Sequence, residues 1–134
     1  MSDKSLIEKY VPKEKWEEAF KLLEKVYPFQ YIIGNVEFYN LNSKVNENVL
    51  IPRFETEYLV DDLIKLIKEH NFVKPNILDL GTGSGCIAIA LKKNIDSFVT
   101  AIDNNNLSLN VAKENAKDNN VDIDFLLEDI NIYK

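Results

Sequence analysis

Three of the four glycines and one acid lie close together near the middle of the chain, in a pattern that suits ligand binding. The segment reads Asp79-Leu80-Gly81-Thr82-Gly83-Ser84-Gly85, and an apolar run begins at Cys86. Glycine permits positive φ and a close approach of a ligand to the backbone, and the free N–H groups at the start of a helix attract polar or anionic groups. The pattern predicts a strand, a turn and a helix. It favours a turn that binds a nucleotide-like cofactor over one that only makes a tight connection.

The spacing of the glycines separates this turn from two other phosphate-binding loops. A dinucleotide fingerprint needs Gly or Ala at position 86, where this chain has Cys86, and a phosphate loop needs a Gly-Lys-Ser/Thr that the sequence lacks. Glycines at positions 81, 83 and 85 therefore indicate a different ligand of the nucleotide type.

Two further acids follow apolar runs that have the length of strands. Asp103 ends the run from Val99, and Asp129 follows Leu126-Leu127-Glu128. The carboxyl ends of parallel strands meet at one edge of a sheet, where Asp103 could accept hydrogen bonds from two ribose hydroxyls. Two structural alternatives stay open: Asp103 as a helix cap for the segment that starts near Asn106, and Asp129 as an ordinary exposed acid.

The elements that must position these residues can be inferred from apolar spacing. A first helix is expected from about Pro12, followed by a β-hairpin with strands 36–41 and 44–51 and a turn at Asn42-Ser43, and by a helix over 56–70. From residue 76 onward strands and helices alternate, with strands at 76–80, 97–103 and 122–127 and helices at about 84–93 and 106–118. This βαβαβ pattern predicts an α/β protein with a parallel sheet, half of a doubly wound fold.

The predicted sheet leaves its first strand without a partner on one side. In the strand order 3-2-1, no fourth strand is available in the sequence to pair with residues 76–80. An apolar, unpaired edge invites association. We therefore expect the chain to self-associate through this edge, to cover it with the N-terminal hairpin, or to be marginally stable.

Composition excludes several classes of function. A net charge of −6 disfavours direct binding to nucleic acid, which depends on clustered Lys and Arg. The lone Cys86 and the lack of an N-terminal apolar segment favour a reducing, cytoplasmic setting without a membrane span. One His and one Cys are too few for a common metal site, so no metal is expected.

The glycine segment, together with Ala101-Ile102-Asp103 and Glu128-Asp129, resembles the cofactor motifs of class I S-adenosylmethionine-dependent methyltransferases. Four flanking segments narrow the resemblance to the HemK/PrmC family: Pro28 to Gly34 (PFQYIIG), Glu37 to Tyr39 (EFY), Val49 to Glu57 (VLIPRFETE) and Val111 to Ala116 (VAKENA). Members of that family methylate the side-chain nitrogen of the glutamine in the Gly-Gly-Gln loop of class I peptide chain release factors. The resemblance thus implies a protein-glutamine N5-methyltransferase with S-adenosylmethionine as cofactor and release factors as partners.

The resemblance also implies roles for individual residues. Gly81, Thr82, Gly83, Ser84 and Gly85 would wrap the methionine and ribose of the cofactor, and Asp103 would bind the ribose hydroxyls. Asp129 and Ile130 would flank the adenine, and Asp79 would support the turn and reach the cofactor ammonium. Residues 1–50 would form a shortened substrate-recognition region, and residues 51–134 the N-terminal half of the methyltransferase domain.

The chain departs from the family pattern at two places. The catalytic Asn-Pro-Pro-Tyr does not occur, since the four prolines, at positions 12, 28, 52 and 75, are isolated from one another, and Phe54 stands where the family usually has proline. We therefore expect a protein cut short before this motif, with no catalytic residue among the 134, which binds cofactor but does not transfer methyl groups. Two alternatives are a noncatalytic module that binds cofactor or a partner, and a fragment of an N6-adenine DNA methyltransferase.

Overall fold

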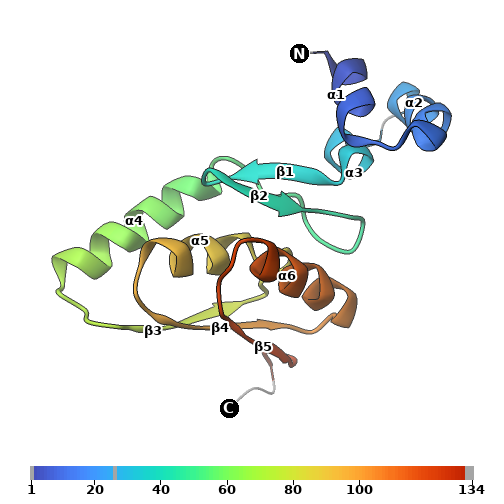
Figure 1. The fold of residues 1–134 in the computed structure, drawn as a ribbon. Coiled ribbons are helices and arrows are strands. Elements are labelled where there is room, and N and C mark those ends of the chain that lie inside the picture. The colour runs from blue at the N-terminus through green and yellow to red at the C-terminus, as the bar shows by residue number, and fades with distance from the viewer. Residues whose placement is uncertain (1, 26, 132–134) are drawn as a thin grey trace.

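The N-terminal region is a group of short helices that stands apart from the sheet (Figure 1). The computed structural model describes residues 2–25 and 27–131. Helix α1 (Asp3–Tyr10), the short 3-10 helix η1 (Lys13–Lys15), α2 (Trp16–Glu24) and α3 (Phe29–Ile33) follow one another. The expectation of a single helix from Pro12 missed α1 and α3. Helix α1 buries only Ile7, but Ser2 caps it by accepting a hydrogen bond from the Ser5 N–H, a signal that the sequence did carry.

The predicted hairpin is present, but its turn was placed too late in the sequence. Strands β1 (Asn35–Phe38) and β2 (Leu41–Lys44) pair antiparallel around Tyr39-Asn40. Both turn residues have positive φ, 51° and 60°. Such two-residue turns match the twist of the flanking strands, and asparagine tolerates this conformation. The turn predicted at Asn42-Ser43 and the strand predicted to reach residue 51 are therefore wrong.

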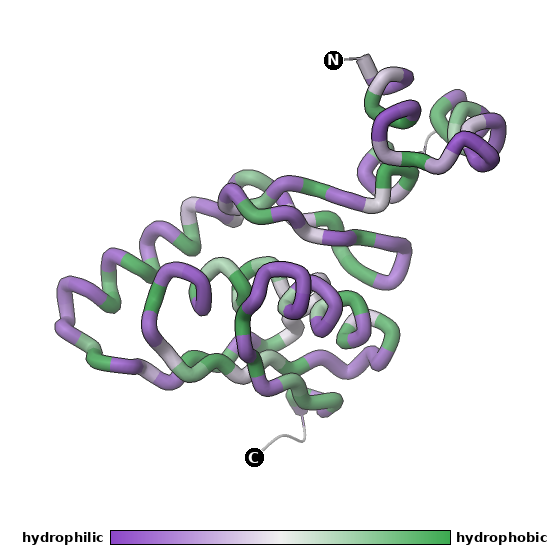
Figure 2. The backbone as a smooth tube through the Cα atoms, in the orientation of Figure 1, coloured by the Kyte–Doolittle hydropathy of each residue, from purple (hydrophilic) through white to green (hydrophobic). Residues whose placement is uncertain are grey.

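Helix α4 (Thr56–Glu69) matches the helix predicted over 56–70. Hydrophilic and hydrophobic segments alternate along it, as expected of an amphipathic helix (Figure 2). Its buried residue Val60 packs in one cluster with Phe38 of β1 and with Ala90 and Leu91. This cluster joins the hairpin to the remainder of the fold.

The βαβαβ unit forms as the sequence predicts. Its elements are β3 (Asn76–Leu80), α5 (Cys86–Asn94), β4 (Phe98–Asp103), α6 (Asn106–Asp118) and β5 (Asp124–Leu127). The strands are parallel in the order β3-β4-β5, with Asp79 opposite Ala101 and Ala101 opposite Phe125. The predicted α/β class and strand order are confirmed.

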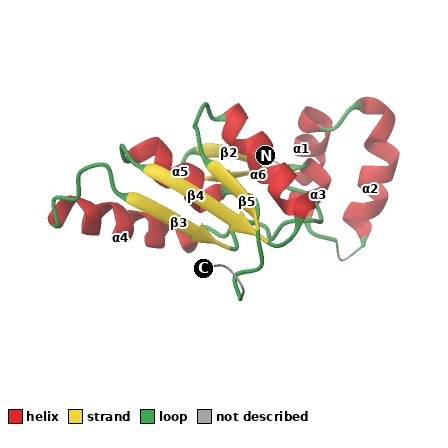
Figure 3. Ribbon diagram, turned by 90° about the horizontal axis from the view of Figure 1, so that it is seen from below, coloured by secondary structure: helices red, strands yellow, loops and turns green. Residues whose placement is uncertain are grey.

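The molecule is layered, with α5 and α6 between the hairpin and the sheet (Figure 1). Seen from below, the three strands lie in front of the helices (Figure 3). The main core, which includes Ala88, Ile89, Val99 and Ala101, therefore lies on one face of the sheet. The hairpin forms a separate two-stranded sheet and does not hydrogen-bond to β3, so it does not cover the edge of β3 by adding a strand there. Over the ranges that the structure describes, no helix is long and apolar enough to cross a membrane.

Candidate functional site

The glycine segment forms a tight turn between β3 and α5. The backbone N–H groups of Gly81 and Thr82 both donate to the carbonyl of Ile102, at 2.8 and 2.9 Å, which fixes the start of the turn on β4. All three glycines have positive φ, 73° at Gly81, 56° at Gly83 and 83° at Gly85. Because residues with a side chain rarely adopt this conformation, the path of the turn depends on glycine.

The three glycines differ in what surrounds them. A Cβ at Gly81 or Gly83 would meet nothing within 4 Å, so the backbone there is open to an approaching ligand. A Cβ at Gly85 would lie 3.1 Å from the Cβ of Ala112 in α6 and 3.2 Å from Cδ1 of Ile89. The first two glycines therefore keep a surface free, whereas the third lets α5 pack closely against α6.

Asp103, at the end of β4, holds the turn from the side. Its Oδ2 accepts a hydrogen bond from the N–H of Gly83 at 3.0 Å, and its Oδ1 accepts one from the N–H of Asn105, also at 3.0 Å. The N-cap of α6 is Asn105, whose side chain accepts from the Leu107 N–H. A carboxylate has about four acceptor positions. Asp103 thus keeps capacity for two more donors, such as a pair of hydroxyls.

Asp79 lies half-buried under the same turn. Its Oδ2 accepts a hydrogen bond from the Thr82 hydroxyl at 2.8 Å. Burial raises the pKa of Asp79 and the negative charge of Asp103 raises it further, while hydrogen bonds from Thr82 and from the Ala88 backbone oppose the rise. The charged form of Asp79 is therefore more costly here than in solvent, a cost that a neighbouring cation would reduce.

Asp129 and Ile130 follow β5 and are less closely tied to the turn. The Glu128 N–H donates to the backbone carbonyl of Asp103 at 3.0 Å, which brings this segment to the end of β4. Among the described residues, Asp129 itself accepts hydrogen bonds from the backbone and side chain of Asn131, within its own loop. Both Asp129 and Ile130 are exposed.

Other candidate reactive groups in the described chain are Cys86, His70 and the residue types that bind metal ions. Burial raises the pKa of the Cys86 thiol to about 11, which keeps it protonated at neutral pH. The Nδ1 of His70 lies 3.0 Å from the Leu66 carbonyl, a local contact at the end of α4. Residues 2–25 and 27–131 hold no group of three or more His, Cys, Asp or Glu side chains that could bind a metal ion.

One buried side chain beside the turn was not singled out by sequence reasoning. Asn115 of α6 donates to the carbonyl of Ser84 at 2.9 Å and also contacts the backbone of Lys44 in β2. Asparagine is a weak helix former, so one on the buried face of a helix was the available signal.

Two large clefts among the described residues flank the hairpin, and neither is lined by the glycine turn. One, of about 630 Å³, lies between the N-terminal helices and the hairpin and is lined in part by Tyr10, Phe29 and Asn42. The other, of about 640 Å³, is lined in part by Tyr31 and by Pro52 and Arg53, which belong to the segment after the hairpin. The turn instead lies at the carboxyl end of β3, outside both clefts.

The parallel sheet, the glycine turn and the acid at the end of β4 place the protein among the class I methyltransferase folds. A tRNA (uracil-54, C5)-methyltransferase from Pyrococcus abyssi, in complex with S-adenosyl-L-homocysteine, aligns with 67% of this chain and 22% of its own, with a TM-score of 0.55 and 25% identity. An S-adenosylmethionine-dependent methyltransferase from Clostridium acetobutylicum aligns with 56% of this chain and 30% of its own, with a TM-score of 0.51 and 23% identity, a likeness of fold alone.

Residues 56–132 match the methyltransferase small domain, and the chain belongs to this family. A release factor glutamine methyltransferase from Flavobacterium psychrophilum is 47% identical to it over 86% of this chain and 41% of the relative. One from Thermodesulfovibrio yellowstonii is 42% identical over 95% of this chain and 42% of the relative. The chain thus spans about two fifths of the length of these curated relatives.

Proposed function

We propose that this chain is the cofactor-binding part of an S-adenosylmethionine-dependent enzyme that methylates the glutamine side chain of peptide chain release factors. The observation that carries the proposal is the hydrogen bond from Gly83 to Asp103, which links an open glycine turn to a carboxylate with unused acceptors. The names of the relatives, at 47% and 42% identity, support the release factor as substrate over DNA. A release factor substrate also agrees with a cytoplasmic location.

In this proposal each side of the turn binds a different part of the cofactor. The backbone of Gly81 and Gly83, where a Cβ would meet nothing within 4 Å, faces the methionine and ribose, and Asp103 accepts hydrogen bonds from the ribose hydroxyls. The side chains of Thr82 and Ser84 are buried and hold the turn, so these residues meet the cofactor through their backbone, and Gly85 lets α5 pack against α6. Asp129 and Ile130 border the adenine, for which their exposure leaves room.

Asp79 binds the ammonium group of the cofactor, directly or through water. Its carboxylate is half-buried and lies near the negative charge of Asp103, so a cation relieves the electrostatic cost that raises its pKa. Binding of the ammonium therefore favours ionised Asp79. Affinity should fall as the pH drops through this raised pKa.

Methyl transfer needs more than the cofactor site. The bound cofactor supplies a methyl group on a sulfonium, and an amide nitrogen attacks it poorly because its lone pair is delocalised. Transfer thus depends on positioning of the amide and on hydrogen bonds to it, which the family motif Asn-Pro-Pro-Tyr provides. Residues 1–134 do not contain this motif. We expect them to bind cofactor without transferring its methyl group.

Calorimetry with S-adenosylmethionine tests the ribose assignment. Asp103→Ala removes the acceptor and frees the Gly83 N–H, so the affinity should fall by about tenfold or more, since hydrogen bonds to charged groups contribute about 1.5–3 kcal/mol. Asp96→Ala, an exposed acid that precedes β4, is the control with the same charge change. Equal affinities of the two variants would contradict the assignment. A methylation assay on a Gly-Gly-Gln peptide tests the expected lack of transfer.

A further inference from the structure

Asn115 is the most deeply buried polar residue of the described chain, with 1% of its surface exposed in the middle of α6. Its Oδ1 accepts a hydrogen bond from the Lys44 N–H at 2.7 Å. Its Nδ2 donates to the carbonyl of Lys44 at 3.0 Å and to the carbonyl of Ser84 at 2.9 Å. One side chain therefore joins three segments that are distant in sequence: the hairpin, the glycine turn and α6.

The contact with Ser84 acts on the peptide group in the middle of the turn. On one side of this group, the Ser84 carbonyl accepts from Asn115, and on the other, the Gly85 N–H donates to the Thr82 carbonyl at 2.9 Å. Both ends of the peptide plane are thus held. Since rotation of this plane would change φ at Gly85, which is 83°, Asn115 constrains the path of the whole turn.

Other contacts between α6 and the hairpin do not reach the turn. Asn119, one helical turn later, donates to the carbonyls of Asn42 at 3.0 Å and of Asn115 at 2.9 Å. Lys44 forms exposed ion pairs with Glu114 and Asp118. The hairpin would remain attached to α6 without Asn115, but it would no longer be connected to Ser84.

We propose that Asn115 is a positioning residue that fixes the glycine turn against the hairpin, so that the place of the hairpin sets the geometry of the cofactor site. The part of this inference that concerns cofactor affinity rests on the proposed function. The hydrogen-bond geometry alone carries the part that concerns the order of the turn.

The main test is Asn115→Asp, with Asn119→Asp as the matched control. The new carboxylate can still accept from the Lys44 N–H, but it has no donor for the carbonyls of Ser84 and Lys44 until it is protonated, when it regains one donor. Because the buried Ser84 carbonyl loses its donor, we expect affinity for S-adenosylmethionine to fall by about tenfold at pH 8 and to recover at lower pH relative to wild type in the same buffer. Asn119→Asp should change the affinity by less than about twofold, as an exposed contact would.

The titratable groups around Asn115 are the same in the control. They are Lys44 of the hairpin, Glu114 and Asp118 of α6, and the Cys86 thiol, which lines the same small cavity. A recovery confined to Asn115→Asp therefore reports its own carboxyl group. An identical pH profile in both variants would overturn the inference.

Amide hydrogen exchange without cofactor separates the inference from the proposed function. In Asn115→Asp at pH 8 the Gly85 amide should exchange faster, while the amide of Leu91, which lies deeper in α5 and is not bonded to the turn, should not. If this variant does not fold at pH 8, Asn115→Ala takes its place, since alanine favours the helix and also lacks the donor. Wild-type exchange at Gly85 in the folded variant would refute the inference. Failure of the wild-type chain to bind cofactor would contradict the proposed function only.

Discussion

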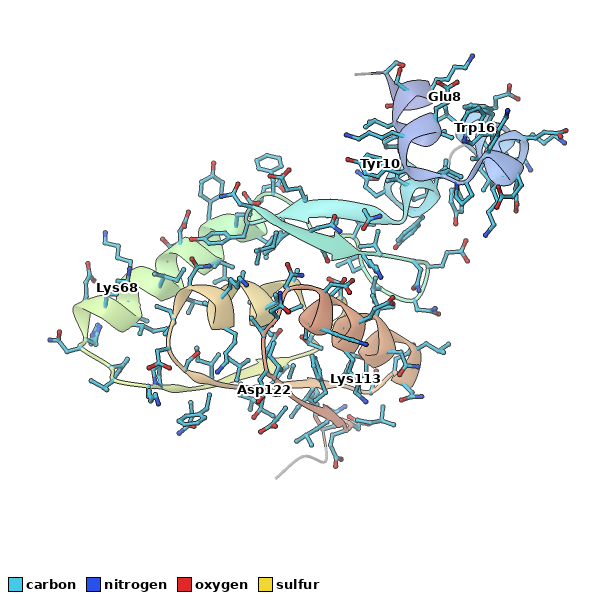
Figure 4. All side chains as sticks on the ribbon, viewed as in Figure 1. Glu8, Tyr10, Trp16, Lys68, Lys113 and Asp122 are labelled. Carbon is cyan, nitrogen blue, oxygen red and sulfur yellow. The ribbon has the colours of Figure 1, made fainter. Side chains whose placement is uncertain are left out.

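The two faces of the three-stranded sheet differ sharply. On the face that packs against α5 and α6, Val99 and Ala101 are buried. On the other face Leu78, Leu80, Phe98 and Leu126 are 48%, 51%, 60% and 37% exposed. Side chains project there below the strands, away from the helices (Figure 4). Helices α5 and α6, which follow the glycine turn and Asp103, both lie on the covered face. The candidate site is therefore built from that side of the sheet.

The bare face is apolar although nothing in the described residues covers most of it. Contiguous exposed apolar side chains are typical of surfaces that pack against other protein. Ile102, which is fully buried at the end of β4, is the exception, and it lies next to the turn whose N–H groups bind its carbonyl. The covered part of this face is therefore the part beside the site. Self-association through the edge of β3 stays a prediction.

The largest predicted difference is in the free energy of unfolding when one side chain on each face of the sheet is truncated to alanine. Ile89→Ala opens a cavity between α5 and the sheet, and we expect a loss of about 2–5 kcal/mol in the free energy of unfolding. Leu78→Ala, on the bare face, should cost less than about 1 kcal/mol because its side chain is already in contact with solvent. Urea unfolding followed by circular dichroism measures both. Similar losses would show that the bare face is packed in solution.

A second, smaller difference in stability is expected between alanine substitutions at two glycines of the turn. Gly85→Ala adds a methyl group 3.1 Å from Ala112 in a left-handed conformation, so we expect a loss of about 2–3 kcal/mol. Gly81→Ala carries the conformational cost without a close contact, and about 1 kcal/mol is expected. Thermal unfolding of the two variants tests the order. A greater loss at Gly81 would contradict the division of the turn into an open and a packed part.

The smallest predicted effect is the change in stability with pH that the ionisation of Asp79 causes. Burial raises the pKa of Asp79 in the folded state above its unfolded value, so the stability linked to this group is present below the unfolded pKa and is lost as pH rises through the folded one. Asp79→Asn keeps an acceptor for the Thr82 hydroxyl and removes this loss. The Asp79→Asn variant should therefore be more stable than wild type above the folded-state pKa of Asp79, and equally stable in acid.

The measurement for Asp79 is the free energy of unfolding across the acidic and neutral range. Asp124→Asn, an exposed acid of β5 on the same side of the sheet as Leu126, is the control for loss of a charge. A gain for Asp79→Asn that does not change with pH would refute the electrostatic account.

Local patterns allowed much of the fold to be predicted. Helix α6 lies at 106–118, as predicted from apolar residues that repeat at helical spacing, but its N-cap is Asn105 and not Asp103, so the reading of Asp103 as the cap is wrong. The glycine turn was found because positive φ at three positions almost requires glycine. The hairpin turn was misplaced because Tyr39-Asn40 is a weaker turn signal than Asn42-Ser43, and Ser43 is instead buried in β2 near Asn115.

The sequence by itself determined the βαβαβ order, the conformation of the turn and the acids that follow its strands, since these depend on spacing and on the backbone freedom of single residues. Only the tertiary structure decided that Asp103 holds Gly83, that Asn115 joins the hairpin to Ser84, and that one face of the sheet stays bare. Those contacts link residues 20 or more positions apart. Their geometry depends on how helices and strands pack, which no local pattern specifies.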